Sequence, residues 1–102
     1  MKIPKRLKIG GHYVQVKNCR DIVSDDGRVK YLGKSFTSEN LIVLAHEYDG
    51  RELPKSTVDE TFLHEIVHVV ETNAGLNLKE GQVNALASGL YQVLKDNKLS
   101  FT

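Results

Sequence analysis

The chain contains 102 residues and has a formal net charge of +1, with 14 Lys and Arg side chains against 13 Asp and Glu. Hydrophobic residues make up 40% and charged residues 26%, the composition of one folded domain over residues 1–102. The near-neutral charge argues against nucleic acid as the main partner, because phosphate-binding domains are usually strongly basic. No apolar run of about 18 residues is present, so we expect no membrane partner, and the single Cys19 favours a reducing cytoplasm.

The first half of the chain has the sequence patterns of β-strands. Residues 8–17 alternate, with His12, Val14 and Val16 on one side, which predicts a half-buried strand. Residues 22–31 contain two short apolar segments separated by an Asp-Gly pair. This segment predicts a β-hairpin, because glycine accepts the positive φ angle of a tight turn.

A third strand is predicted over the continuous apolar run 41–45. It is either an edge strand, to which an extended peptide can add by main-chain hydrogen bonds, or an interior strand. After Pro54 the apolar spacing changes to the 3.6-residue period of a helix. The predicted fold is therefore α+β, with a short N-terminal sheet of about three to four strands packed on two C-terminal helices.

Two helix starts can be recognised in the second half. Thr57 and Glu60 form a capping-box pattern for the first helix, and Gly75 provides its stop signal. Asn77 and Glu80 form the second start pattern. The first helix has apolar residues over nearly half of its circumference, which predicts a central position: Phe62, Leu63, Ile66, Val67, Val69 and Val70. The second helix has one apolar side: Val83, Leu86, Ala87, Leu90 and Leu94.

The first predicted helix contains the sequence HEIVH at positions 64–68. Its two histidines, one turn apart, have Cβ atoms about 5–6 Å apart, so both imidazoles can reach one metal ion at bond lengths of about 2.0–2.1 Å. Glu65 cannot share that coordination, but it lies beside the ion and can take a proton from an activated water. The motif predicts Zn²⁺ bound by His64 and His68, with Glu65 as general base. The alternative is a pair of structural histidines hydrogen-bonded in the core.

A catalytic zinc site usually has three protein ligands and one open position, and two glutamates are candidates for the third ligand. Glu71 falls on the histidine face but lies about 10 Å along the axis from His64, and one straight helix does not wrap three ligands around an ion. Glu80 follows the turn at Gly75, where an antiparallel second helix returns toward the histidines. Glu80 is therefore favoured; its alternative role is to cap the second helix.

Further positions are candidates for supporting roles. Asn84, one turn after Glu80, either holds a ligand histidine through a hydrogen bond or is an exposed polar residue. A hydrolytic site also needs a donor for the developing oxyanion. The sequence offers five without choosing among them: His12, Tyr13, His46, Tyr48 and Tyr91.

The segment LHEIVH at 63–68, followed by Glu80 and Asn84 within 80–87, resembles the gluzincin metallopeptidases, especially the small ImmA/IrrE-like and prophage-encoded zincins. The resemblance covers residues 57–97 and, more loosely, the preceding strands. It implies a minimal zincin-like fold, Zn²⁺ at His64, His68 and Glu80, and Glu65 as base. The chain lacks the separate substrate domain of larger members, so the resemblance does not identify a substrate.

The predicted function is that of a cytoplasmic zinc metallopeptidase, which hydrolyses a bond in a peptide or protein substrate through metal-activated water. The alternative is a non-catalytic zinc-binding interaction or accessory module of phage or mobile-element origin. A closed fourth coordination position would favour the alternative. Cleavage specificity and oligomeric state do not follow from these residues.

Overall fold

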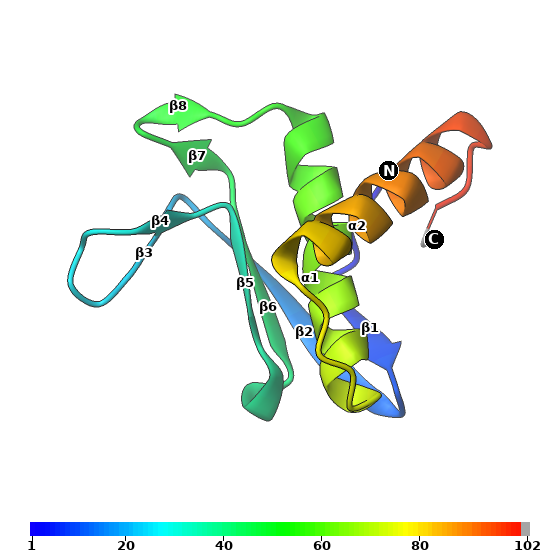
Figure 1. Cartoon of the computed structure of the whole chain (residues 1–102). Helices are drawn as coiled ribbons and strands as arrows, with labels where there is room; N and C mark the ends of the chain where they lie inside the picture. The colour runs from blue at the N-terminus through cyan, green and yellow to red at the C-terminus, as the bar shows by residue number, and fades with distance from the viewer. Residues whose placement is uncertain (101–102) are drawn as a thin grey trace.

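A computed structural model describes residues 1–100 of the chain (Figure 1). Strands occupy the first half, and two helices follow them, α1 (Lys55–Asn73) and α2 (Glu80–Asp96). The predicted α+β class is confirmed. In the described part of the chain, neither helix combines the length and the apolarity needed to cross a bilayer.

The main sheet has four strands in the order β1 (Arg6–Ile9), β2 (His12–Cys19), β6 (Leu41–Ala45) and β5 (Gly33–Phe36). Strands β2 and β6 are parallel, and the other two neighbouring pairs are antiparallel. The strand at 41–45 is therefore interior, and β5 forms the edge of the sheet on that side. This resolves the alternative that the sequence left open.

The strand predicted over residues 8–17 is divided in two. Gly10 and Gly11 have φ angles of 58° and 88° and form the turn between β1 and β2. Residues with a side chain rarely adopt these angles, so the glycine pair determines where the chain reverses. Val14 and Val16 are buried as predicted, whereas His12 is exposed.

The remaining short elements are β3 (Ile22–Val23), β4 (Lys30–Tyr31), the 3₁₀ turn η1 (Thr37–Glu39), β7 (Glu47–Tyr48) and β8 (Arg51–Glu52). β3 and β4 form the predicted hairpin, with Gly27 at a φ angle of 74° in its turn. β7 and β8 form a second two-stranded ribbon. Both ribbons extend from the same end of the main sheet (Figure 1), and an ion pair between Lys30 and Asp49 joins them.

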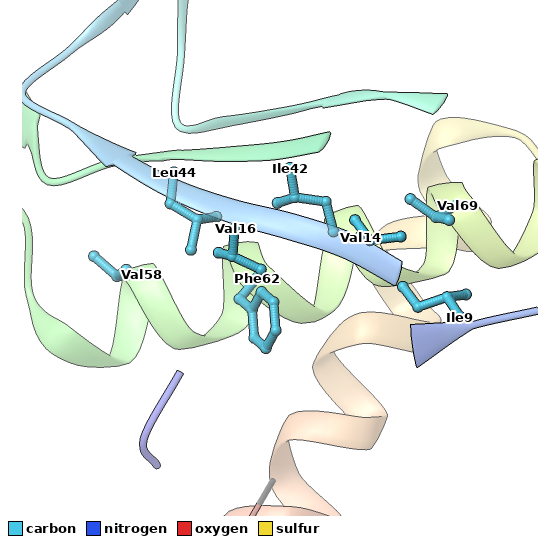
Figure 2. Packing of buried hydrophobic residues seen from close by; sticks show 8 residues of the cluster. All are labelled: Ile9, Val14, Val16, Ile42, Leu44, Val58, Phe62 and Val69. Carbon is cyan, nitrogen blue, oxygen red and sulfur yellow. The ribbon is translucent and has the colours of Figure 1, made fainter. Parts of the chain in front are cut away.

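Helix α1 lies between the sheet and α2: it packs on β5 and β6, and α2 packs on α1. Figure 2 shows the core between α1 and the sheet, formed by Ile9, Val14, Val16, Ile42, Leu44, Val58, Phe62 and Val69. Phe62 is fully buried in this cluster. The helical period then turns His64 and His68 to another side of α1. The core packing in this way fixes the orientation of the histidine motif.

Helix α1 begins earlier than predicted. Its first residue is Lys55, with Pro54 at the N-cap, and the N–H groups of Thr57 and Val58 donate hydrogen bonds to the Pro54 carbonyl at 3.0 and 3.2 Å. The capping box of Thr57 with Glu60 is therefore wrong, because both residues lie inside the helix. The predicted stop is confirmed, with Gly75 at a φ angle of 70° just after the helix.

Helix α2 begins at Glu80 and not at Asn77. Gln82 takes the role that the sequence suggested for Glu80: its side-chain oxygen accepts a hydrogen bond of 2.9 Å from the Lys79 N–H. The connection between the helices runs back beside α1, so α2 begins near the middle of α1 and leaves at an oblique angle (Figure 1). The Glu80 carboxylate is thus not needed for capping and starts α2 close to the histidine motif.

Candidate metal centre

Three side chains from two helices meet at one point. His64 Nε2 lies 2.7 Å from Glu80 Oε1, and His68 Nε2 lies 3.4 Å from the same oxygen. The two Nε2 atoms are 3.0 Å apart. One potential ligand atom from each residue therefore points to a common position. Both histidines are half-buried, whereas the Glu80 side chain is 66% exposed.

The donor set of this cluster fits zinc. Two imidazole nitrogens and one carboxylate oxygen are common zinc ligands, and tetrahedral bonds of about 2.0–2.1 Å separate neighbouring donor atoms by about 3.3 Å. The distances of 3.0 and 3.4 Å lie close to that value, and the contact of 2.7 Å between His64 and Glu80 is shorter. The three residues line a cleft of about 360 Å³, whose wall also includes Gly33, Lys34 and Ser35 of β5. Three potential ligand atoms are thus brought together at the wall of this cleft.

Glu71 contacts the other nitrogen of His68. The His68 Nδ1–H donates a hydrogen bond of 3.3 Å to Glu71 Oε1, and the backbone N–H of Leu78 donates one of 3.0 Å to Glu71 Oε2. A carboxylate only accepts, so the proton of a neutral His68 lies on Nδ1, and Nε2 carries the lone pair that could bind a metal. Glu71 therefore orients the histidine from behind and ties it to the connection between the helices.

The protonation of His68 reflects opposing influences. Burial lowers its pKa, but the hydrogen bond to Glu71 and the nearby carboxylates of Glu65 and Glu80 outweigh burial, and the pKa of His68 is raised above its ordinary value.

Glu65 is buried beside the cluster, with only 5% of its surface exposed. Burial raises the pKa of the Glu65 carboxyl above its ordinary value, and the neighbouring His64 and His68 oppose part of this rise. The side chain lies against β5 at Gly33, where an added Cβ atom would be 3.2 Å from Glu65 Cγ and 2.6 Å from Thr61 Cγ2. Only glycine lets the edge strand approach α1 so closely at this position.

A second cavity of about 390 Å³ adjoins the cleft. The two share Tyr31, Gly33, His64 and Glu65 in their walls, and the second extends between β4 and the two helices toward Glu60. The histidine motif thus lies at the junction of a cleft along β5 and a cavity between the helices.

The remaining predicted positions lie elsewhere or make different contacts. Asn84 is exposed in the wall of the second cavity, and within residues 1–100 it donates no hydrogen bond to either histidine. Of the described residues, none of the five oxyanion candidates lines the cleft or the adjoining cavity: His12, Tyr13, His46, Tyr48 and Tyr91. His46 instead lies 2.8 Å from Asn18 Oδ1 through its Nε2.

The aromatic residue that does lie at the site is Tyr31, which the sequence suggested only as a hairpin residue. Glu71 was considered as a ligand and not as a positioning residue. Its position three residues after His68, on the same helix face, was the available signal for this role.

Comparisons with known proteins do not extend this description. No family model matches the chain, and neither a curated protein nor a solved structure gives a match. Any statement about its function therefore depends on the residues of the site itself.

Proposed function

We propose that the protein is a small gluzincin-type zinc metallopeptidase, with His64, His68 and Glu80 as the residues that would hold Zn²⁺. The observation that carries this proposal is the convergence of three donor atoms at mutual distances of 2.7 to 3.4 Å, next to the buried Glu65. Structural histidines need no third donor of this kind from another helix. The carboxylate at the start of α2 favours a metal centre over a hydrogen-bonded pair.

The site contains residues for metal binding and for proton transfer, two requirements of metal-assisted hydrolysis. When bound, zinc polarises a carbonyl group and makes a water molecule more acidic. Glu65 accepts the proton that this water loses as its oxygen attacks the carbonyl carbon, and returns it to the amine nitrogen when the C–N bond breaks. Glu71 holds His68 in the tautomer that leaves Nε2 free for the ion.

The edge strand β5 is the element suited to hold a substrate backbone. It ends the main sheet and lines the cleft with Gly33, Lys34 and Ser35. A free strand edge offers unpaired N–H and C=O groups to an extended peptide. We therefore assign to β5 the peptide-docking role that the sequence suggested for residues 41–45, because both edges of β6 are already paired with neighbouring strands. A cytoplasmic location, suggested by the single Cys19, is part of the same proposal.

The proposal is tested by measuring zinc content and peptide cleavage together. Protein purified without chelator is analysed for metal and then incubated with peptides and with lysate proteins at neutral pH. Wild type is compared with His68→Ala, with Glu65→Gln and with His12→Ala, a matched control for an exposed histidine outside the site. Zinc-dependent cleavage that both His68→Ala and Glu65→Gln lose supports the proposal. Zinc binding without cleavage would instead favour the non-catalytic accessory module.

A further inference from the structure

The cavity beside the metal centre contains an acidic group that the proposed chemistry does not use. Glu60 lies one helical turn before His64 on α1, and its side chain lines this cavity. Ser88 of α2 donates a hydrogen bond from Oγ to Glu60 Oε1. Within residues 1–100, no Lys, Arg or His side chain forms an ion pair with Glu60. One carboxylate oxygen is therefore positioned by α2, and the negative charge has no protein counterion.

The positive charge at the cavity wall is already neutralised. Lys30 is the cationic residue among those that line the cavity, and it forms an ion pair with Asp49. Its Nζ also lies 5.8 Å from the centre of the Tyr48 ring. The cavity wall therefore presents the Glu60 carboxylate without an ion-pair partner, whereas the Lys30 ammonium group in the same wall is paired with Asp49.

The rest of the lining is suited to a hydrocarbon chain. Leu32, Ala87, Thr57 and Thr61 also line the cavity, and each of these side chains carries at least one methyl group. A lysine or arginine side chain combines an apolar stem with a cationic end. The stem suits the apolar part of the lining, and the cationic end suits the Glu60 carboxylate. The cavity joins the cleft at His64 and Glu65, so a side chain entering it would belong to a residue close to the bond being cut.

We propose that this cavity receives a lysine or arginine side chain of the substrate and that Glu60 is its anionic partner. The inference rests on the proposed peptidase function and adds to it a class of substrate. An acidic side chain would be repelled by the Glu60 carboxylate, and a purely apolar one would leave that carboxylate without an ion-pair partner. Glu60 is thus a specificity-determining residue and takes no part in the chemical step.

The test uses capped alanine peptides that are identical except at one position, which carries Lys, Arg, norleucine or Glu. Each position of the peptide is varied in turn. Binding to metal-free protein is followed by NMR titration of amide signals near Thr57 and Ala87, so it does not depend on cleavage. The proteins are wild type, Glu60→Gln, which keeps the shape and an acceptor for Ser88, and Glu39→Gln, a control for an exposed acid in η1. Unchanged melting temperatures show that the variants fold.

We expect Lys and Arg peptides to bind wild type about tenfold more tightly than the norleucine peptide, as for a charge-assisted contact. Glu60→Gln should remove this difference, and Glu39→Gln should keep it. Equal binding of Lys and norleucine peptides, or a preference that survives Glu60→Gln, overturns the inference.

Cleavage of the same peptides by zinc-loaded protein separates the two proposals. If a preference for Lys or Arg depends on Glu60 in binding but no peptide is cut, the assignment of the cavity stands and the peptidase function fails. If peptides are cut without regard to the varied side chain, the peptidase function stands and the assignment of the cavity fails.

Discussion

His68 and Glu71 form a pair in which the imidazole Nδ1–H donates to the carboxylate at 3.3 Å, while Nε2 of the same ring points to Glu80. The carboxylate is in turn held by the Leu78 N–H. This relationship distinguishes the two glutamates that the sequence left as alternatives. Glu80 lies on the Nε2 side of the imidazole, where the proposed zinc ion would bind, and Glu71 lies on the Nδ1 side.

Substitution of the two glutamates should therefore weaken zinc binding to different degrees. Glu80→Ala removes a donor atom, whereas Glu71→Ala removes only the support of His68, an effect of about 10–100-fold on metal affinity. We expect Glu80→Ala to reduce zinc affinity more than Glu71→Ala, as measured by competition with a chromogenic chelator. The reverse order would mean that Glu71 is the ligand and that the cluster at Glu80 has no role in binding.

Glu65→Gln should separate metal binding from catalysis. The amide has the same shape but accepts no proton, and general-base catalysis contributes typically about 10²–10⁴-fold. Zinc content and melting temperature should stay near those of wild type, while the cleavage rate falls by about that factor. Equal cleavage by wild type and variant would show that the observed activity belongs to other residues or to a contaminant.

Gly33→Ala should disturb Glu65 without removing a ligand. The new Cβ would lie 2.6 Å from Thr61 Cγ2 and 3.2 Å from Glu65 Cγ, so the edge strand, Thr61 or the Glu65 side chain must move. We expect lower kcat with zinc affinity retained. Thr61→Ser deletes the methyl group with the closest contact and should restore part of the activity in the double variant.

Gly89→Ala is the control for this substitution, because a Cβ at that position in α2 meets no atom within 4 Å. The change should leave activity unaltered and stabilise the helix by about 0.5–1 kcal/mol. Loss of activity in Gly89→Ala to the same extent as in Gly33→Ala would contradict a local effect at Glu65.

The orientation of α1 depends on Phe62, which is fully buried against the sheet. Phe62→Ala should lower the free energy of unfolding by about 3–5 kcal/mol, as is usual for a buried aromatic residue. Leu86→Ala, at a position 49% exposed, should cost far less. Urea denaturation of both variants measures the difference. Similar losses would mean that the core does not lie between α1 and the sheet.

Part of this architecture could be predicted from local sequence patterns. The change from alternating to helical spacing after Pro54 gave the α+β class, and the 3.6-residue period alone places His64 and His68 on one side of a helix. Strand β5 was not predicted, because Gly33 to Phe36 has no apolar alternation. Its position depends on pairing with β6 and on the close approach of Gly33 to α1.

The apolar period of the second helix did not predict correctly which of its residues are buried. Leu86 and Leu90 were predicted to face inward with Val83 and Ala87, but they are 49% and 46% exposed. Helix α2 packs mainly on α1, so fewer of its apolar residues are buried than the sequence pattern predicted. On α1, Val70 is likewise 47% exposed.

The supporting residues of the site were also difficult to predict, because their roles depend on contacts between segments. Glu71 becomes a support for His68 only because the connection between the helices returns to place the Leu78 N–H beside it. Glu60 resembles a capping residue in the sequence, and it lines a cavity because α1 extends back to Lys55 and Ser88 faces it from α2.

X-ray absorption spectroscopy of zinc-loaded protein tests the central claim most directly. The account predicts one zinc ion per chain, coordinated by two imidazole nitrogens and by oxygen at about 2.0–2.1 Å, with His68→Ala losing this signal. Zinc bound through the Cys19 sulfur at about 2.3 Å, or an ion whose spectrum is unchanged in His68→Ala, would contradict it.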